Sequence, residues 1–517
     1  MMFIARLVLV IAIMAASVGS ASPAQAATYD PITGTGSTWS QNALDQWRKN
    51  VAANYGMTVN YSGVGSSAGR RDFTQGSVDF AVSEIPFQSK PEDGSAPEVP
   101  GFGYAYMPIV AGGTSFMYNL KINGKRVSNL RLSGETVTKI FTGTITNWND
   151  AAIKADNPGL AMPDKKIVPV VRSDGSGSTA QFTLWMSKQH SALWNAFCKS
   201  VGRASPCGLT SQYPTFGNAK AQSGSNGVAG YVSQDYGEGA ITYVEYSYAL
   251  RSGFPVAKVL NSAGYYVEPT ANAVAVALLK ASINSNEGSA DYLTQILDGV
   301  YNSSDPRTYP LSSYSYMIVP TEVGGIFTER KGITLSTFAT YMLCEGQQQA
   351  TALGYSPLPM NLVIAGFDQI ARIPGSSGTA PDITKCNNPT FKAGDSPSSN
   401  QLATNAPQPA ACDKKGSTQC ATGTGGLTTP TTTSNTGSSS TATDGASTDG
   451  SFVAEGSFTG GSSLGSNAVA APFDLPDETW GGPQFLMLFA GALLIVVAVL
   501  PPLLWRRFTA LSKGGGR

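Results

Sequence analysis

Three glycine- and serine-rich turns hold the residues whose types and spacing best suit the binding of an anion. They are Gly-Thr-Gly-Ser-Thr-Trp-Ser at 34–40, Gly-Val-Gly-Ser-Ser-Ala-Gly at 63–69 and Arg-Ser-Asp-Gly-Ser-Gly-Ser-Thr at 172–179. Glycine lets backbone N–H groups approach a ligand, hydroxyl groups can donate, and a helix that begins after such a turn favours negative charge at its N-terminus. A single turn of this kind is more typical of an ordinary helix cap. Three of them favour an anion site.

The third turn adds a cation to these donors. Arg172 presents a forked guanidinium group that suits an oxyanion, and Asp174 is close enough in sequence to orient it. The turn lacks the Gly-Lys-Ser/Thr ending of a P-loop. Its glycine spacing fits a dinucleotide-binding loop only loosely, because no acidic residue follows until Asp235 to bind a ribose.

Composition excludes several classes of protein. The 517 residues include 34 Lys and Arg and 34 Asp and Glu, so the net charge is zero, and a nucleic-acid binder would need a basic excess. His190 is the single histidine, which excludes histidine-rich metal sites. An enzyme with Ser176 as nucleophile, His190 as base and Asp174 as orienting acid is one alternative. We interpret His190 as a surface or helix-cap residue and expect neither an enzyme nor a cofactor.

The turns need a scaffold of alternating strands and helices to position them. The apolar residues Leu44, Trp47 and Val51 predict one helix face. Runs with strand character lie at 59–61, 78–82, 116–120, 167–171 and 240–244, and further helices are predicted at 334–343 and 361–373. Two of the three turns directly follow predicted strands. Mixed strands and helices of this kind predict an α/β protein with largely parallel sheets.

Several motifs recur in a fixed order along the chain, at 34–39, 61–67, 78–84, 147–150, 172–179 and 241–246. These motifs and their order resemble a known family, the phosphate-binding component (PstS type) of bacterial ABC phosphate importers. The resemblance implies a periplasmic-binding-protein fold within 27–394, in which two α/β lobes close over one inorganic phosphate. Lobe 1 would combine about 28–112 with 250–390, and lobe 2 would be about 113–249. It also implies delivery of phosphate to the membrane permease subunits of an ABC importer.

The resemblance also implies a set of phosphate-binding residues. Those expected to donate to phosphate oxygens are Thr38 and Trp39 through their backbone N–H groups, Ser66, Arg172, Ser176, Gly177 and Ser178. Asp174 would hold Arg172 in place.

One position departs from the family. Where the family normally has Asp, this chain has Glu84, in the sequence Ser-Glu-Ile-Pro at 83–86. A carboxylate at this position would accept a hydrogen bond from a protonated phosphate oxygen and repel a fully ionised sulfate. Because Glu is one methylene longer than Asp, another protonated oxyanion remains an alternative ligand.

Both ends of the chain predict export and membrane attachment. Residues 1–26 have the charge, apolar core and small-residue cleavage site of a signal peptide. Residues 395–482 are rich in Ser, Thr and Gly and predict a flexible, disordered stalk. An apolar transmembrane helix at 483–504 and a basic cytoplasmic tail at 505–517 would then anchor the protein at the cell surface. The long stalk also leaves open a surface adhesion or scaffold protein with the same fold.

Six cysteines in an exported chain favour disulfides over metal ligation. Their spacing favours Cys198 with Cys207 and Cys412 with Cys420. Cys344 with Cys386 follows only by elimination, and six cysteines allow 15 connectivities.

Overall fold

The computed structural model describes residues 29–91, 94–286, 288–289 and 292–425. These residues belong to the first of two compact units into which the chain divides, 1–440 and 441–517. The predicted signal peptide, transmembrane helix and basic tail lie outside the described residues, as does the stalk from 426 onward. None of the helices within 29–425 that the structure describes is long and apolar enough to cross a membrane.

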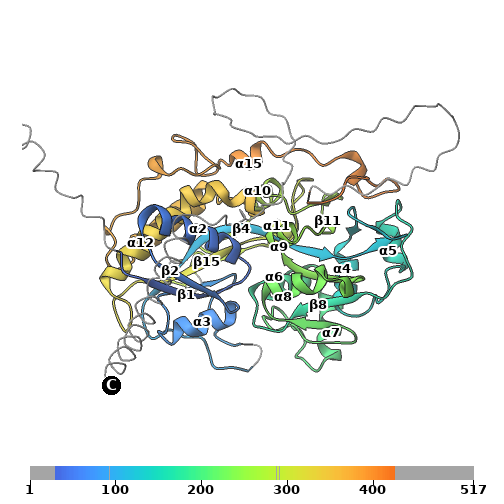
Figure 1. Cartoon of the computed structure of the whole chain (residues 1–517), viewed down its shortest axis with the longest axis horizontal. Helices are drawn as coiled ribbons and strands as arrows, with labels where there is room; N and C mark the ends of the chain where they lie inside the picture. Colours follow the sequence, from blue (N-terminus) through green and yellow to red (C-terminus); the bar gives the residue numbers. More distant parts are fainter. Residues whose placement is uncertain (1–28, 92–93, 287, 290–291, 426–517) are drawn as a thin grey trace, which may run out of the picture. The chain divides into compact units, whose positions relative to one another are not determined.

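An eight-stranded mixed sheet runs through this unit, in the strand order β2-β1-β3-β15-β4-β10-β8-β9. Its strands are β1 (Ile32–Gly36), β2 (Val59–Gly63), β3 (Phe80–Ser83), β4 (Tyr104–Tyr118), β8 (Val168–Arg172), β9 (Lys220–Gln222), β10 (Ala240–Glu245) and β15 (Ser312–Pro320). The strands β2, β1 and β3 are parallel to one another, as are β10, β8 and β9. The two long strands β4 and β15 are antiparallel to each other and join the two groups (Figure 1). The expected α/β architecture is confirmed.

Two lobes are built on the two groups of strands. The helices over lobe 1 are α2 (Gln41–Tyr55), α3 (Ser66–Thr74), α12 (Glu329–Leu343) and α14 (Met360–Ile370). Those of lobe 2 are α4 (Gly134–Phe141), α5 (Ala151–Asp156), α6 (Gly177–Gln189), α7 (Ser191–Ser200), α8 (Gly224–Ser233), α9 (Tyr246–Arg251) and α11 (Asp298–Tyr301). Helix α10 (Ala271–Leu278) supplies apolar side chains to the cores of both lobes.

The structure corrects the expected lobe boundaries. Residues 250–311, which we expected in lobe 1, pack mainly in lobe 2, where Val259, Leu297 and Tyr309 belong to its core. The strand β11 (Lys258–Leu260) pairs with β7 (Arg131–Leu132) of the same lobe. The chain enters lobe 2 along β4 and returns only at β15, so lobe 1 comprises about 29–112 and 312–391.

The structure also corrects the start of the expected stalk. Residues 392–425, here called the C-terminal strap, run from lobe 1 across α10 to lobe 2 (Figure 1). The short helix α15 (Gln401–Thr404) packs on α10. Farther on, Lys258 Nζ lies 2.9 Å from both carboxylate oxygens of Asp413 in a buried ion pair. The part of 395–482 that the structure describes is therefore folded.

The three expected disulfides are confirmed. They are Cys198–Cys207, which joins the last turn of α7 to the loop after it, Cys344–Cys386, at the end of α12, and Cys412–Cys420, in the C-terminal strap. The closed loop of the last pair is held on lobe 2 by Arg131, whose Nη1 donates to the carbonyls of Cys412 at 3.1 Å and Thr418 at 2.9 Å.

Candidate functional site

The three glycine- and serine-rich turns each connect the end of a strand to the start of a helix. The first joins β1 to α2, the second joins β2 to α3, and the third joins β8 to α6. Ser176 caps α6, with its hydroxyl accepting a hydrogen bond from the N–H of Thr179. Because β1, β2 and β3 are parallel, the turns that follow them lie at one edge of the sheet. The third turn, from lobe 2, meets this edge.

Glu84, which directly follows β3, is a buried carboxylate with three hydroxyl donors. Ser37 and Ser315 donate to its Oε1, each at 2.5 Å, and Ser66 donates to its Oε2 at 2.8 Å. A Cβ on Gly177 would lie only 1.8 Å from Oε2. The Glu84 carboxylate therefore reaches the N-terminus of α6, and the absence of a side chain at Gly177 leaves room for it.

Arg172 and Asp174 form the buried charged pair of the third turn. Arg172 Nε donates to Asp174 Oδ1 at 2.8 Å, and its Nη2 donates to Oδ2. The N–H of Gly224, at the start of α8, also donates to Asp174 Oδ1, at 2.9 Å. Burial raises the pKa of Asp174, but the hydrogen bonds and charge of Arg172 outweigh that effect and leave the pKa below its ordinary value. The carboxylate thus stays ionised and fixes the plane of the guanidinium group.

The first turn contacts lobe 2 through Thr38. Its hydroxyl lies 2.9 Å from the hydroxyl of Ser225 and accepts a hydrogen bond from the N–H of Ser225 at 3.0 Å. Arg172 Nη1 makes a long contact with the same Ser225 hydroxyl, at 3.4 Å. The N–H of Trp39 donates to Ser37 Oγ at 2.9 Å, so in this arrangement its hydrogen bond is made within the first turn.

The second and third turns meet directly across the two lobes. The N–H of Gly177 donates to Ser66 Oγ at 3.1 Å, and the N–H of Ser67 donates to the carbonyl of Gly175 at 3.1 Å. Ser178 Oγ is buried and has no hydrogen-bond partner among the described residues. The structure thus brings together the nine residues predicted from the sequence, which are Thr38, Trp39, Ser66, Glu84, Arg172, Asp174, Ser176, Gly177 and Ser178.

Sequence reasoning missed several members of this cluster. Ser37 lies inside a turn that the sequence did single out. Ser315 is in the middle of β15, where no motif marks it. Ser225 is the second residue of α8, in the glycine- and serine-rich stretch 223–227, which the sequence analysis did not single out. Only the pairing of β15 beside β3 and the contact between lobes bring these two hydroxyls to the site.

The geometry does not support a hydrolytic triad. Ser176 is at the N-terminus of α6 and His190 at the C-terminus of the same 13-residue helix, so about 20 Å separates them. The His190 ring instead packs against Trp185, with 4.9 Å between the ring centroids. Among the residues that the structure describes, no cluster of His, Cys, Asp and Glu could hold a metal ion.

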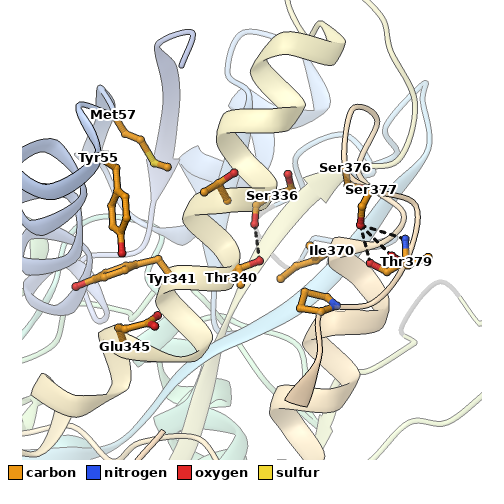
Figure 2. A pocket seen from close by; sticks show the side chains of 12 residues that line it. Tyr55, Met57, Ser336, Thr340, Tyr341, Glu345, Ile370, Ser376, Ser377 and Thr379 are labelled. Carbon is orange, nitrogen blue, oxygen red and sulfur yellow. Dashed lines mark hydrogen bonds between the residues drawn. The ribbon is translucent and has the colours of Figure 1, made fainter. Parts of the chain in front are cut away.

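A separate surface pocket of about 350 Å³ lies on lobe 1 between α2, α12 and the end of α14 (Figure 2). Tyr55, Met57 and Tyr341 are among the residues that line it, and Glu345 is the one charged residue of the lining. Because its lining contains no Lys or Arg, this pocket is poorly suited to an anion. The buried cluster around Arg172 and Glu84 is the better candidate.

Comparisons with known proteins show the family to which the chain belongs. A family model described as a PBP superfamily domain matches residues 21–345. The phosphate-binding protein PstS of Xylella fastidiosa (strain Temecula1) is 34% identical over 332 residues, which cover 64% of this chain and 82% of that protein. The phosphate-binding protein PstS 3 of Mycobacterium tuberculosis (strain CDC 1551) is 30% identical over 331 residues, covering 63% of this chain and 82% of that protein.

Two solved structures share the fold at low sequence identity. A high-affinity periplasmic phosphate-binding protein (PfluDING) bound with phosphate has a TM-score of 0.50 at 19% identity, covering 70% of this chain and 100% of that one. The phosphate-binding protein from Stenotrophomonas maltophilia also has a TM-score of 0.50, at 18% identity, covering 69% of this chain and 98% of that one.

Proposed function

The chain belongs to the PBP superfamily and, within it, to the PstS phosphate-binding proteins, and we propose that it binds one inorganic phosphate ion between its lobes. It is a binding component of a phosphate importer and not an enzyme, and it delivers the ion to the permease subunits of an ABC transporter. The observation that carries the proposal concerns the turn that leads into α6, which holds the fixed guanidinium group of Arg172 and whose Gly177 lies against the buried carboxylate of Glu84.

The donors of the site suit a multiply charged oxyanion. Arg172 is almost fully buried and is already oriented by Asp174, so it can offer its remaining N–H groups without reorganisation. Gly177 and Ser178 begin α6, where the backbone N–H groups and the helix dipole favour negative charge. The unpartnered hydroxyl of Ser178 supplies a further donor.

Glu84 gives the site its selectivity. Three serine hydroxyls donate to its carboxylate oxygens, and a carboxylate can only accept. An oxyanion that still carries a proton can donate to Glu84 Oε2, whereas fully ionised sulfate meets repulsion there. Arsenate has the same protonation chemistry as phosphate and is the alternative ligand of this class.

We further propose that this binding domain lies outside the cell membrane and is anchored to it. The support is the apolar run at 483–504, followed by Arg506 and Arg507, which favour a cytoplasmic tail. The three disulfides agree with an exported protein.

The test is isothermal titration of the full-length chain in detergent with phosphate, arsenate and sulfate. We expect phosphate binding in the parent protein and a loss of about 1.5–3 kcal/mol of binding free energy, roughly 10- to 150-fold, in Arg172→Ala. Arg71→Ala removes an exposed arginine from α3 and is the matched control. Binding by Arg172→Ala within about twofold of the parent would contradict the site assignment. A parent protein that binds none of the three anions would support the adhesion or scaffold alternative.

A further inference from the structure

A small cavity with both polar and apolar lining lies beside the site, where α6 faces β15 and α11. Its volume is about 10 Å³, and Gln181, Tyr301 and Ser313 are among the residues that line it. Each of these three side chains is more than nine-tenths buried. The oxygen atoms Gln181 Oε1, Tyr301 Oη and Ser313 Oγ have no hydrogen-bond partner among the described residues. Unpartnered polar atoms that share one cavity indicate a shared ligand.

The orientation of Gln181 follows from its other contact. Its Nε2 donates to the backbone carbonyl of Glu84 at 2.8 Å. A carbonyl oxygen can only accept, so the amide nitrogen must face Glu84, and Oε1 is left as the atom without a partner. Gln181 is four residues after Gly177 in α6, so both residues present the same face of the helix to lobe 1.

This hydrogen bond joins the two lobes. Gln181 belongs to lobe 2 and Glu84 to lobe 1, so the bond exists only when the lobes are together. A second amide, Gln295 Nε2, reaches the same carbonyl at 3.2 Å, but Gln295 is itself held by the backbone of Tyr314 through two hydrogen bonds of 2.9 Å. Gln295 falls within 250–311, but its two hydrogen bonds to Tyr314 tie it to lobe 1. Gln181 lies in α6 of lobe 2, so its contact with Glu84 is the one that depends on closure.

The cavity has the size and chemistry of a site for one water molecule. A single water needs about 10–15 Å³ and makes about three hydrogen bonds when buried. Burial raises the pKa of Tyr301, so its hydroxyl keeps its proton and can donate to a water. The same water can donate to Gln181 Oε1 and to Ser313 Oγ, which satisfies all three atoms.

We propose that Gln181 is a positioning residue for Glu84, which it holds across the closed lobes, and that one buried water bound by Tyr301 and Ser313 fixes the Gln181 amide. The inference rests on the proposed phosphate-binding function. Its consequence is that the Gln181 contact stabilises the closed, loaded form and slows phosphate release.

The first test compares Gln181→Met with Gln189→Met in the full-length chain. Methionine has a similar volume and no amide. Gln189 is at the other end of α6, where its side chain makes a long, exposed contact with Asn302 at 3.4 Å. We expect Gln181→Met to bind phosphate about tenfold more weakly, mainly through faster release in stopped-flow measurements, and Gln189→Met to match the parent. The melting temperature without phosphate should stay close to that of the parent.

The possible outcomes separate this inference from the proposed function. A parent that does not bind phosphate contradicts the function itself. A parent that binds phosphate together with a Gln181→Met variant that binds and releases it equally well overturns the positioning role. If Gln181→Met does not fold, Gln181→Asn keeps the amide but withdraws it by one methylene, and its release rate decides the same question.

The second test concerns the water. Tyr301→Phe should weaken phosphate binding about threefold. Combining it with Gln181→Met should cause no further loss of phosphate affinity, because both substitutions break the same hydrogen-bond network around the water. A high-resolution crystal structure of the phosphate complex should show one water within hydrogen-bonding distance of Gln181, Tyr301 and Ser313. A dry cavity, or fully additive losses in the double variant, would overturn the role of the water.

Discussion

The substitution Glu84→Gln tests how the site distinguishes one oxyanion from another. In the structure Ser37 and Ser315 both donate to Glu84 Oε1, whereas Oε2 accepts from Ser66 and faces Gly177. A glutamine has one oxygen and one NH2 group, and the oxygen is the atom that can satisfy the two donors at the Oε1 position. The NH2 group would then replace Oε2. The atom that faces α6 would change from an acceptor to a donor.

The expected change in affinity follows from that exchange. Protonated phosphate loses one hydrogen bond to a charged acceptor, which is worth about 1.5–3 kcal/mol, or roughly 10- to 150-fold in Kd. Sulfate loses the repulsion of a carboxylate and gains a donor, so its affinity should rise. The phosphate-to-sulfate selectivity should therefore fall by more than the loss of phosphate affinity alone.

The assay is a competition titration of the full-length protein with both anions at constant pH. Glu135→Gln removes the same charge from an exposed position on α4 and should leave the selectivity unchanged. Glu84→Asp restores the residue that is usual in the family, so it should keep the preference for phosphate while the affinity changes modestly. If folded Glu84→Gln discriminates between phosphate and sulfate as the parent does, Glu84 is not the selectivity element and the reasoning fails.

Two further predictions concern stability. Asp413→Asn should lower the free energy of unfolding by about 3 kcal/mol in urea denaturation, because it leaves the buried amine of Lys258 without its charged partner. The control is Asp368→Asn at an exposed position, which should lower it by less than about 0.5 kcal/mol. Burial raises the pKa of Glu245 well above its ordinary value, so the folded state binds a proton that the unfolded state releases, and stability falls as the pH rises above about 4.5. Glu245→Gln should remove that loss, so the variant should gain stability relative to the parent at pH 8 but not at pH 4. An equal difference at both pH values would contradict the assignment of a neutral Glu245.

Much of the candidate site could be predicted because its residues lie in local motifs. The three turns follow parallel strands or precede helices, and these local signals mark them as candidate anion sites. The resemblance to the PstS family then implies that Ser66, Arg172 and Gly177 share one site. Ser225 and Gln181 could not be found in this way, because their roles depend on contacts between lobes. A glutamine inside a helix, such as Gln181, has no sequence signal that distinguishes a surface residue from one that touches the opposite lobe.

The C-terminal strap shows a different limit of sequence reasoning. Its composition predicts too little apolar surface for an ordered segment, and the structure indeed orders it mainly through polar contacts and a disulfide. Thr424, for example, donates from its hydroxyl to the carbonyl of Val256 at 2.8 Å and accepts from the N–H of the same residue at 3.0 Å. Composition describes how much apolar area a segment can bury, but it does not reveal which distant polar groups will pair with it.

The path of the strap constrains how the lobes can move. Phe391 fixes its beginning in the core of lobe 1, and the loop closed by Cys412–Cys420 fixes its end on lobe 2. Between these points it packs on α10, which contributes side chains to both cores. The chain thus crosses between the lobes a third time, in addition to β4 and β15. A rotation that opens the site while all three crossings stay attached must have its axis close to α10, because the crossings change least in length there. Such an opening separates Glu84 from Gln181 and Thr38 from Ser225. It moves the strap only a little.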